Sequence, residues 1–193
     1  MRHFVYFSQK AQTSGNFDDL MKAGRLDIAI HVIIASFFLS HGVRDDVKTH
    51  LVFYGMPDPP KHIEMQVTPE LDINKKDVAT LIKKILYKYK PGQKTEVLPG
   101  CFIEKKNLFD LLEELIEQGN ELFVLDKRGE KLRDAKLPEN CIFLIGDQDG
   151  IPKKELRRLK TIANKVSIGP KMYFASHVVA VVNNELDNRQ SRD

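Results

Sequence analysis

The sequence lacks any run of apolar residues long enough to cross a membrane. A membrane-spanning helix needs about 20 consecutive, predominantly apolar residues, and no stretch of the 193-residue chain approaches that length. The first residues, Met1 to Phe7, have the pattern of a strand rather than of a cleaved secretion signal. We therefore expect a cytoplasmic protein that does not associate with membranes.

Cysteine is also scarce, with two residues in the chain, Cys101 and Cys141. They lie too far apart in sequence to form the closely spaced pair of a metal-binding clip, and Cys141 opens an apolar run that is typical of a buried strand. Free thiols in the core are expected, with a disulfide as the alternative. No metal site is predicted.

Several signatures of nucleotide and metal sites are missing. The chain has no G-x-x-x-x-G-K-[ST] loop for a nucleoside triphosphate, no H-E-x-x-H zinc motif and no C-x-x-C pair. The dinucleotide fingerprint G-x-G-x-x-G is absent after every candidate strand. A nucleoside cofactor in this protein would have to be held in another way.

Charge of one sign is not in large excess. The 30 Lys and Arg against 27 Asp and Glu leave a net charge of +3, so charge alone does not identify a nucleic-acid-binding protein. A hydrophobic content of 42% is enough for one domain that buries roughly 70% of its unfolded surface. We predict a single domain over residues 1–193.

Three short apolar runs in the second half of the chain each end in a polar, glycine-containing loop. The runs are rich in branched and aromatic residues, which is typical of strands buried on both faces of a parallel sheet. Ligands of such sheets bind beyond the carboxyl ends of the strands, where these loops would converge. The runs are residues 122–125, 141–145 and 166–168.

The remaining segments alternate between helix and strand patterns. Apolar residues spaced i, i+3, i+4 and i+7 predict amphipathic helices, while the alternation from His62 to Val67 predicts a half-exposed strand in a hairpin or at a sheet edge. Together they predict an α/β fold with a mostly parallel sheet sandwiched by helices. The predicted helices cover residues 26–39, 78–89, 108–116, 153–160 and the segment from Phe174.

Two glycine-containing motifs give the chain a resemblance to a known superfamily. Residues 143–152 read FLIGDQDGIP and residues 166–177 read VSIGPKMYFASH. Together with the helix through residues 183–187, they resemble the cofactor half of SPOUT-superfamily methyltransferases. AGRLD at residues 23–27 and SHGVR at residues 40–44 narrow the resemblance to the archaeal tRNA (pseudouridine-54 N1)-methyltransferases.

The resemblance implies an enzyme that uses S-adenosylmethionine to methylate N1 of pseudouridine at position 54 in the T-loop of tRNA. It also implies a C-terminal trefoil knot and a homodimer. The spacing of the residues shows neither, since chain patterns alone favour an unknotted sheet. Two other functions stay open: methylation of a pseudouridine in ribosomal RNA, and a non-catalytic RNA-binding module with the same fold.

In SPOUT-like sites the cofactor lies in the loops after the last strands, where backbone groups contact the adenine and apolar side chains enclose it. Glycine suits such loops because the backbone can approach a ligand where no Cβ intervenes. The alternative for Gly146 and Gly169 is an ordinary turn. Family members often have cysteine at the position of Val178, so valine here argues against a thiol nucleophile. The expected cofactor contacts are Leu125, Gly146, Ile168, Gly169, Pro170, Lys171, Met172, Tyr173 and Val178.

Methylation of pseudouridine N1 removes a weakly acidic ring proton, so a carboxylate and a cation are expected near the acceptor. We expect Arg25 to position a phosphate or the base, and Asp19 or Asp27 to take the proton. The alternative is structural: Asp27 caps the helix that follows, and Arg25 pairs with it.

Contacts to tRNA are expected around the same site. Proteins commonly bind the RNA backbone with Lys and Arg, and stack unpaired bases on aromatic side chains. The expected phosphate contacts are Lys10, Lys22, Arg25 and Arg44, and the candidates for stacking are Tyr6, Phe17 and Tyr173.

Overall fold

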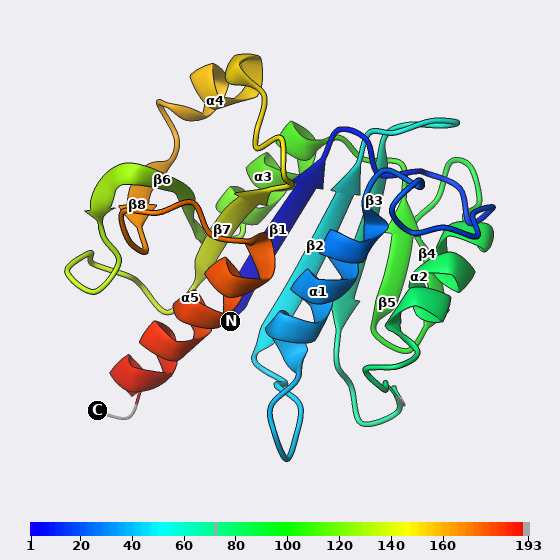
Figure 1. Cartoon of the computed structure of the whole chain (residues 1–193), viewed down its shortest axis with the longest axis horizontal. Helices are drawn as coiled ribbons and strands as arrows, with labels where there is room; N and C mark the ends of the chain where they lie inside the picture. Colours follow the sequence, from blue (N-terminus) through cyan, green and yellow to red (C-terminus); the bar gives the residue numbers. More distant parts are fainter. Residues whose placement is uncertain (72, 191–193) are drawn as a thin grey trace.

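The computed structural model describes residues 1–71 and 73–190. Over this part of the chain, eight strands form one sheet and five helices pack against it (Figure 1). The strands are β1 (Arg2–Ser8), β2 (Val47–Phe53), β3 (Lys61–Gln66), β4 (Thr95–Leu98), β5 (Cys101–Glu104), β6 (Glu121–Lys131), β7 (Cys141–Gly146) and β8 (Asn164–Ser167). The helices are α1 (Leu26–Phe37), α2 (Val78–Tyr87), α3 (Leu108–Glu117), α4 (Lys153–Leu159) and α5 (Ala175–Gln190).

The sheet is mixed, with the strand order β4-β5-β3-β2-β1-β7-β6-β8. The three apolar runs that predicted parallel strands form β6, β7 and β8, and all three run parallel to their neighbours. The other half of the sheet is antiparallel through β3, β5 and β4. The strand predicted at a hairpin or an edge, β3, does pair antiparallel with β2, but it lies inside the sheet because the unpredicted β5 covers its other side.

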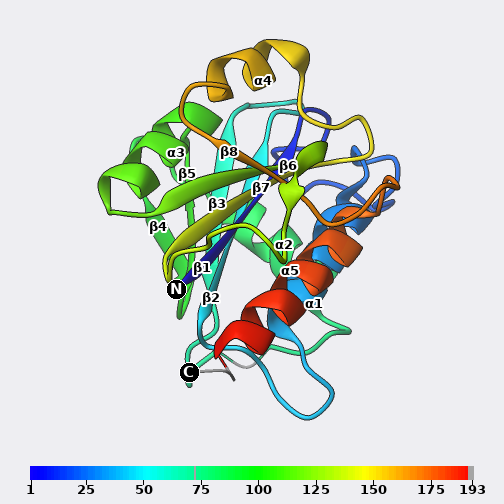
Figure 2. The same cartoon turned by 90° about the vertical axis from the view of Figure 1, so that its left-hand side faces the viewer.

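Helices cover both faces of the sheet (Figure 2). Helices α1, α2 and α5 bury their apolar sides against one face, and α3 packs on the other face. Every residue of the central strand β1 is buried, as expected for a strand covered on both sides. Among the described residues, no helix combines the length and hydropathy that crossing a membrane requires. Both cysteines are buried and free, as predicted.

On the face of the sheet that α3 covers, a row of polar side chains crosses four neighbouring strands, β1, β2, β3 and β5. His3 Nδ1 lies 3.1 Å from His50 Nε2, His50 Nδ1 lies 3.0 Å from His62 Nε2, and His62 Nδ1 lies 3.0 Å from Glu104. Burial opposes ionisation of Glu104, but hydrogen bonds from His62 and Lys106 lower its pKa from 4.5 to about 2, so the carboxylate only accepts hydrogen bonds. Burial lowers the pKa of all three histidines, which favours neutral rings, and each neutral ring then donates from Nδ1 toward Glu104. His50, His62 and Glu64 could each offer a metal-ligand atom within 4.8 Å of the others, but the two facing ring nitrogens already share a hydrogen bond.

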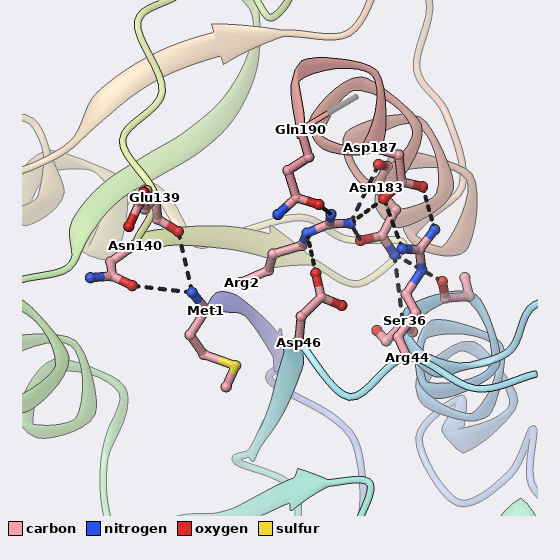
Figure 3. Close-up of polar contacts among 11 residues, drawn as sticks. Met1, Arg2, Ser36, Arg44, Asp46, Glu139, Asn140, Asn183, Asp187 and Gln190 are labelled. Carbon is pink, nitrogen blue, oxygen red and sulfur yellow. Dashed lines mark hydrogen bonds and ion pairs between the residues drawn. The ribbon is translucent and has the colours of Figure 1, made fainter. Parts of the chain in front are cut away.

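The amino-terminal strand is tied to the end of the last helix by a polar network (Figure 3). Arg2 is 3% exposed. Its guanidinium lies 3.0 Å from Asp46 and 2.8 Å from Asp187, and it also donates to Gln190 at 2.8 Å. Arg44 makes a bidentate pair with the same Asp187, at 2.8 and 2.5 Å. These contacts hold the carboxyl-terminal half of α5 against the start of β1, while the first turn of α5 reaches the cavity described next.

Candidate cofactor and substrate site

A cavity of about 430 Å³ lies beyond the carboxyl ends of β7 and β8, beside residues 125–127 in the middle of β6 and next to the start of α5. The glycine-containing loops were predicted to converge here, since parallel strands deliver their following loops to the same edge of the sheet. The loops after β7 and β8 do so, whereas residues 126–129, predicted as a third loop, belong to β6, where the pairing with β8 shifts between Leu125 and Glu130. Apolar side chains and backbone make up most of the wall. The lining residues are 25, 28, 125–127, 144–148, 150, 151, 156, 166–169, 171–175 and 178.

Eight of the nine predicted cofactor contacts line this cavity. The exception is Pro170, which is exposed and lines an adjoining hollow between the β6–β7 connection and α5. The eight that line the cavity are Leu125, Gly146, Ile168, Gly169, Lys171, Met172, Tyr173 and Val178. The residues named from the motif are therefore brought together, while their role toward a cofactor remains a prediction.

Other lining residues were not predicted. Gln148, Gly150 and Ile151 belong to the quoted GDQDGIP motif, and their position in it could have identified them. Asp126 is the first polar residue after an apolar run, which is another usable signal. Leu156 reaches the cavity from α4, and no sequence pattern indicated this.

The loop after β7 has no room for a side chain at its glycine. A Cβ on Gly146 would lie 2.6 Å from the carbonyl carbon of Gly150. Gly169 has a φ of 150°, and a Cβ there would lie 2.9 Å from the hydroxyl of Tyr173. Gly146 thus allows close packing of two backbone segments, and Gly169 leaves room for the Tyr173 side chain. Both also line the cavity, so the ordinary-turn alternative and a place in the predicted site are compatible.

Asp147 ties this loop to the end of β1. Its carboxylate accepts a 2.7 Å hydrogen bond from Ser8 Oγ and a 2.9 Å hydrogen bond from the Asp149 backbone N–H. Asp149 in turn pairs with Lys10 at 2.6 Å. Lys10 therefore lies close to the site, as expected, but its charge is already neutralised.

Arg25 and Asp27 form the bidentate pair that was the structural alternative. Arg25 precedes α1 with a left-handed backbone (φ 65°), and its Nε and Nη2 lie 3.0 and 2.9 Å from the two Asp27 oxygens. These hydrogen bonds lower the pKa of Asp27 and raise that of Arg25. Arg25 lines the cavity. Asp27 does not line it, but it is paired with Arg25. The predicted capping bond from the Asp27 side chain is not observed; the residue at the cap is Arg25 itself.

Asp19 does not line the cavity. Its Oδ1 accepts from the backbone N–H groups of Met21 and Lys22, at 2.9 and 3.2 Å, in a local turn. Such side chain to backbone bonds are a common structural use of Asp before a helix.

Two RNA-contact predictions are wrong. Arg44 follows α1 and lies at the opposite end of the sheet, paired with Asp187 near the chain termini (Figure 3). Tyr6 is 0% exposed, so its ring cannot stack on a base. Phe17 is only partly exposed, with Lys83 over its ring, whereas Tyr173 lines the cavity and is 42% exposed. Lys22 is exposed beside Asp19.

Comparison with known proteins gives a consistent result. The profile of a family described as SAM-dependent RNA methyltransferases matches residues 1–191. A tRNA (pseudouridine(54)-N(1))-methyltransferase of Methanococcoides burtonii is 36% identical, covering 99% of this chain and 98% of the relative. The corresponding protein of Thermococcus gammatolerans is 33% identical, covering 97% of this chain and 98% of its own.

Among solved structures, Archaeoglobus fulgidus Nep1 bound to S-adenosylhomocysteine superimposes with a TM-score of 0.62 at 16% identity, covering 97% of this chain and 98% of the other. At that identity the likeness concerns the fold. The match of the family profile over nearly the whole length, supported by relatives above 30% identity, places this chain in the family of SAM-dependent RNA methyltransferases.

Proposed function

We propose that this protein transfers a methyl group from S-adenosylmethionine to N1 of pseudouridine 54 in the T-loop of tRNA. The observation that carries the proposal is the convergence of the two motif loops on one cavity, in a chain whose full-length relatives are named for that reaction. Because tRNA is the proposed substrate, we place the reaction in the cytoplasm.

The cavity fits a nucleoside cofactor in size and lining. Its volume of about 430 Å³ lies within the range of roughly 300–1,000 Å³ that is usual for small-molecule sites. Leu125, Ile145 and Val178 offer apolar surface, and at Gly146 and Gly169 no side chain stands between the backbone and the cavity. S-adenosylmethionine supplies a methyl group already activated by a sulfonium, so the protein mainly has to bind, orient and exclude water.

The acceptor requires more from the side chains. Loss of the N1 proton places negative charge on the pseudouridine ring, which a nearby cation stabilises. Arg25 is the predicted group that lines the cavity, and Asp27 is its partner. Asp27 is therefore favoured over Asp19 as proton acceptor. While paired, it is a weak base because its pKa is lowered; an Arg25 that turns toward the RNA would restore its basicity.

We also propose that the carboxyl-terminal segment is knotted and that two copies pair around it. The connection between β6 and β7 supports the knot, because it bonds to segments that come later in the chain: Leu132 N–H donates to the Ser167 carbonyl at 2.9 Å, and Arg189 donates to the carbonyls of Leu132 and Ala135 at 2.7 and 2.9 Å. Exposed apolar side chains at the start of α5, with Phe174 at 75%, support pairing.

Calorimetric titration with S-adenosylmethionine tests the cofactor site. Leu125→Trp should fill the cavity and weaken binding at least tenfold, whereas Leu39→Trp, at an exposed position away from the cavity, should bind like the parent. Thermal melts would confirm that both variants are folded. Equal affinity in the parent and Leu125→Trp would reject this cavity as the site.

Methyl incorporation then tests the reaction. A T-stem-loop with pseudouridine 54 should accept one methyl group, and the same RNA with uridine 54 should accept none, because N1 of uridine carries the glycosidic bond. Methylation of both would exclude N1 as the acceptor, and methylation of neither would favour a non-catalytic module. Preference for a ribosomal RNA fragment bearing pseudouridine would redirect the substrate assignment.

A further inference from the structure

We infer that α4 and its C-cap residue Lys160 form the surface on which the backbone of the substrate RNA docks, through Lys153, Arg157 and Lys160. This inference rests on the proposed RNA methyltransferase function and adds to it the part of the protein that holds the nucleic acid. It replaces Arg44, which lies at the wrong end of the sheet.

Helix α4 stands beside the cavity. It directly follows the loop after β7. Ile151, just before the helix, and Leu156, within it, are part of the cavity wall. Figure 1 shows α4 above β6 and β8 at the upper left of the molecule, and α2 at its right-hand side. An RNA whose base enters the cavity would bring its neighbouring phosphates past α4.

The charge of α4 is concentrated and uncompensated. Residues 153–160 contain five cations and one carboxylate, Glu155, and within the described residues none of the five makes an ion pair. The cations suggested by the sequence are different in this respect. Lys10, Arg25 and Arg44 lie 2.6, 2.9 and 2.5 Å from their aspartate partners. Free cations gain more from a phosphate, because no existing pair has to be broken.

The three cations share one exposed stripe. Lys153, Arg157 and Lys160 are spaced i, i+4 and i+7, so they lie on the same side of a helical segment, and all three are exposed. The inner side of the helix is anchored: Leu159 is 1% exposed, and the Arg158 guanidinium lies 3.5 Å from the ring centroid of Phe109. The stripe is therefore presented to solvent by a helix whose other side is packed.

RNA fits this surface better than a protein partner does. A phosphate chain supplies regularly spaced negative charge and binds Lys and Arg in a sequence-independent way. The proposed substrate, tRNA, supplies such a phosphate chain. Docking of an acidic surface from a second copy is the competing explanation, and it becomes an outcome of the test.

The test compares two triple substitutions that remove the same charge. Lys153→Gln/Arg157→Gln/Lys160→Gln removes the stripe, and Lys76→Gln/Lys84→Gln/Lys88→Gln removes three exposed lysines in and around α2, away from the cavity. Fluorescence anisotropy would measure the affinity for tRNA bearing pseudouridine 54 at several salt concentrations. Calorimetry would measure S-adenosylmethionine binding, and sedimentation the oligomeric state.

Loss of three phosphate contacts should flatten the log–log salt dependence by about 2 and weaken binding up to about 100-fold at 0.1 M salt, at roughly 0.7 counterions released per contact. The α2 variant should keep the parental slope, and both variants should bind S-adenosylmethionine like the parent. A charge-conserving Lys153→Arg/Arg157→Lys/Lys160→Arg variant should retain the parental slope.

An unchanged slope in the α4 variant, or an equal loss in both variants, would overturn the inference. A change of oligomeric state with unchanged tRNA affinity would overturn it in favour of a protein contact. Failure of the proposed function looks different: in that case the parent itself would not bind S-adenosylmethionine or methylate the RNA.

Discussion

Acidification from pH 7.5 to 5.0 should destabilise this protein through its buried histidine row. His3, His50 and His62 are at most 6% exposed, and burial is the largest cause that lowers the pKa of each. For His3 the pKa falls from 6.5 to about 4. The folded protein therefore keeps these rings neutral at a pH where the unfolded chain protonates them.

The loss of stability on acidification follows from proton binding by the two states. Below pH 6.5 the unfolded state binds more protons than the folded state, so the free energy of unfolding falls as the pH falls. At pH 5.0, His3 accounts for about 2 kcal/mol, from 1.5 pH units at about 1.36 kcal/mol each. His50 and His62 act in the same direction. Such a loss is a large share of the roughly 5–15 kcal/mol of a typical domain.

The pH window separates the histidines from the carboxylates. Glu104 and Asp58 also have lowered pKa values, of about 2, but their unfolded values lie at 4.5 and 3.8. Their contribution is present above those values and is lost mainly below pH 5, as the pH falls toward 2. A change measured between pH 7.5 and 5.0 therefore reports chiefly on the histidines.

Urea denaturation at the two pH values gives the measurement. His3→Asn keeps a short donor near His50 but does not titrate, so its stability loss on acidification should be about 2 kcal/mol smaller than that of the parent. His41→Asn, at an exposed position, should behave like the parent. If the parent loses less than about 1 kcal/mol at pH 5.0, the rings are not held neutral and the inferred hydrogen-bond direction is wrong.

Two further predictions concern single residues. Asp27→Asn should slow single-turnover methylation by about 100-fold or more, the usual contribution of a general base. Asp19→Asn should stay near the parental rate, because Asp19 serves a local turn. Equal rates in both variants would show that Asp27 is not the base. Burial raises the pKa of both Cys101 and Cys141 to about 12, so iodoacetamide at pH 7.5 should alkylate neither thiol in the folded protein and both in urea, and rapid labelling of the folded protein would refute their placement in the core.

The local elements were largely predictable, and the exceptions have physical reasons. Strand β5 escaped prediction because it has only four residues, Cys101–Glu104, between a turn at Gly100 and the start of α3. Strand β3 was predicted to be half exposed from its alternation. Its polar residue His62 is 1% exposed, because the histidine row and Glu104 satisfy it inside the sheet.

The error at Arg44 comes from the direction of the chain, whereas the error at Tyr6 comes from burial in β1. Arg44 follows α1 and precedes β2, so it must lie near the amino ends of the parallel strands, whereas the cavity lies at their carboxyl ends. The motif loops were assigned correctly to the cavity because each one directly follows a strand. Whether a residue precedes or follows a parallel strand indicates which end of the sheet it occupies.

Periodicity and turn residues, which depend on neighbours a few positions apart, were enough to identify the helices, the three parallel strands and the loops that line the cavity. Which charges remain free was decided by contacts between distant parts of the chain: Lys10 with Asp149, Arg44 with Asp187, and nothing acidic against the stripe on α4 within the described residues. The amino-acid composition does not distinguish a paired lysine or arginine from an unpaired one. Only the folded arrangement separates cations that are already paired from those still available to bind a phosphate, because electrostatic energy depends on separation in space and not along the chain.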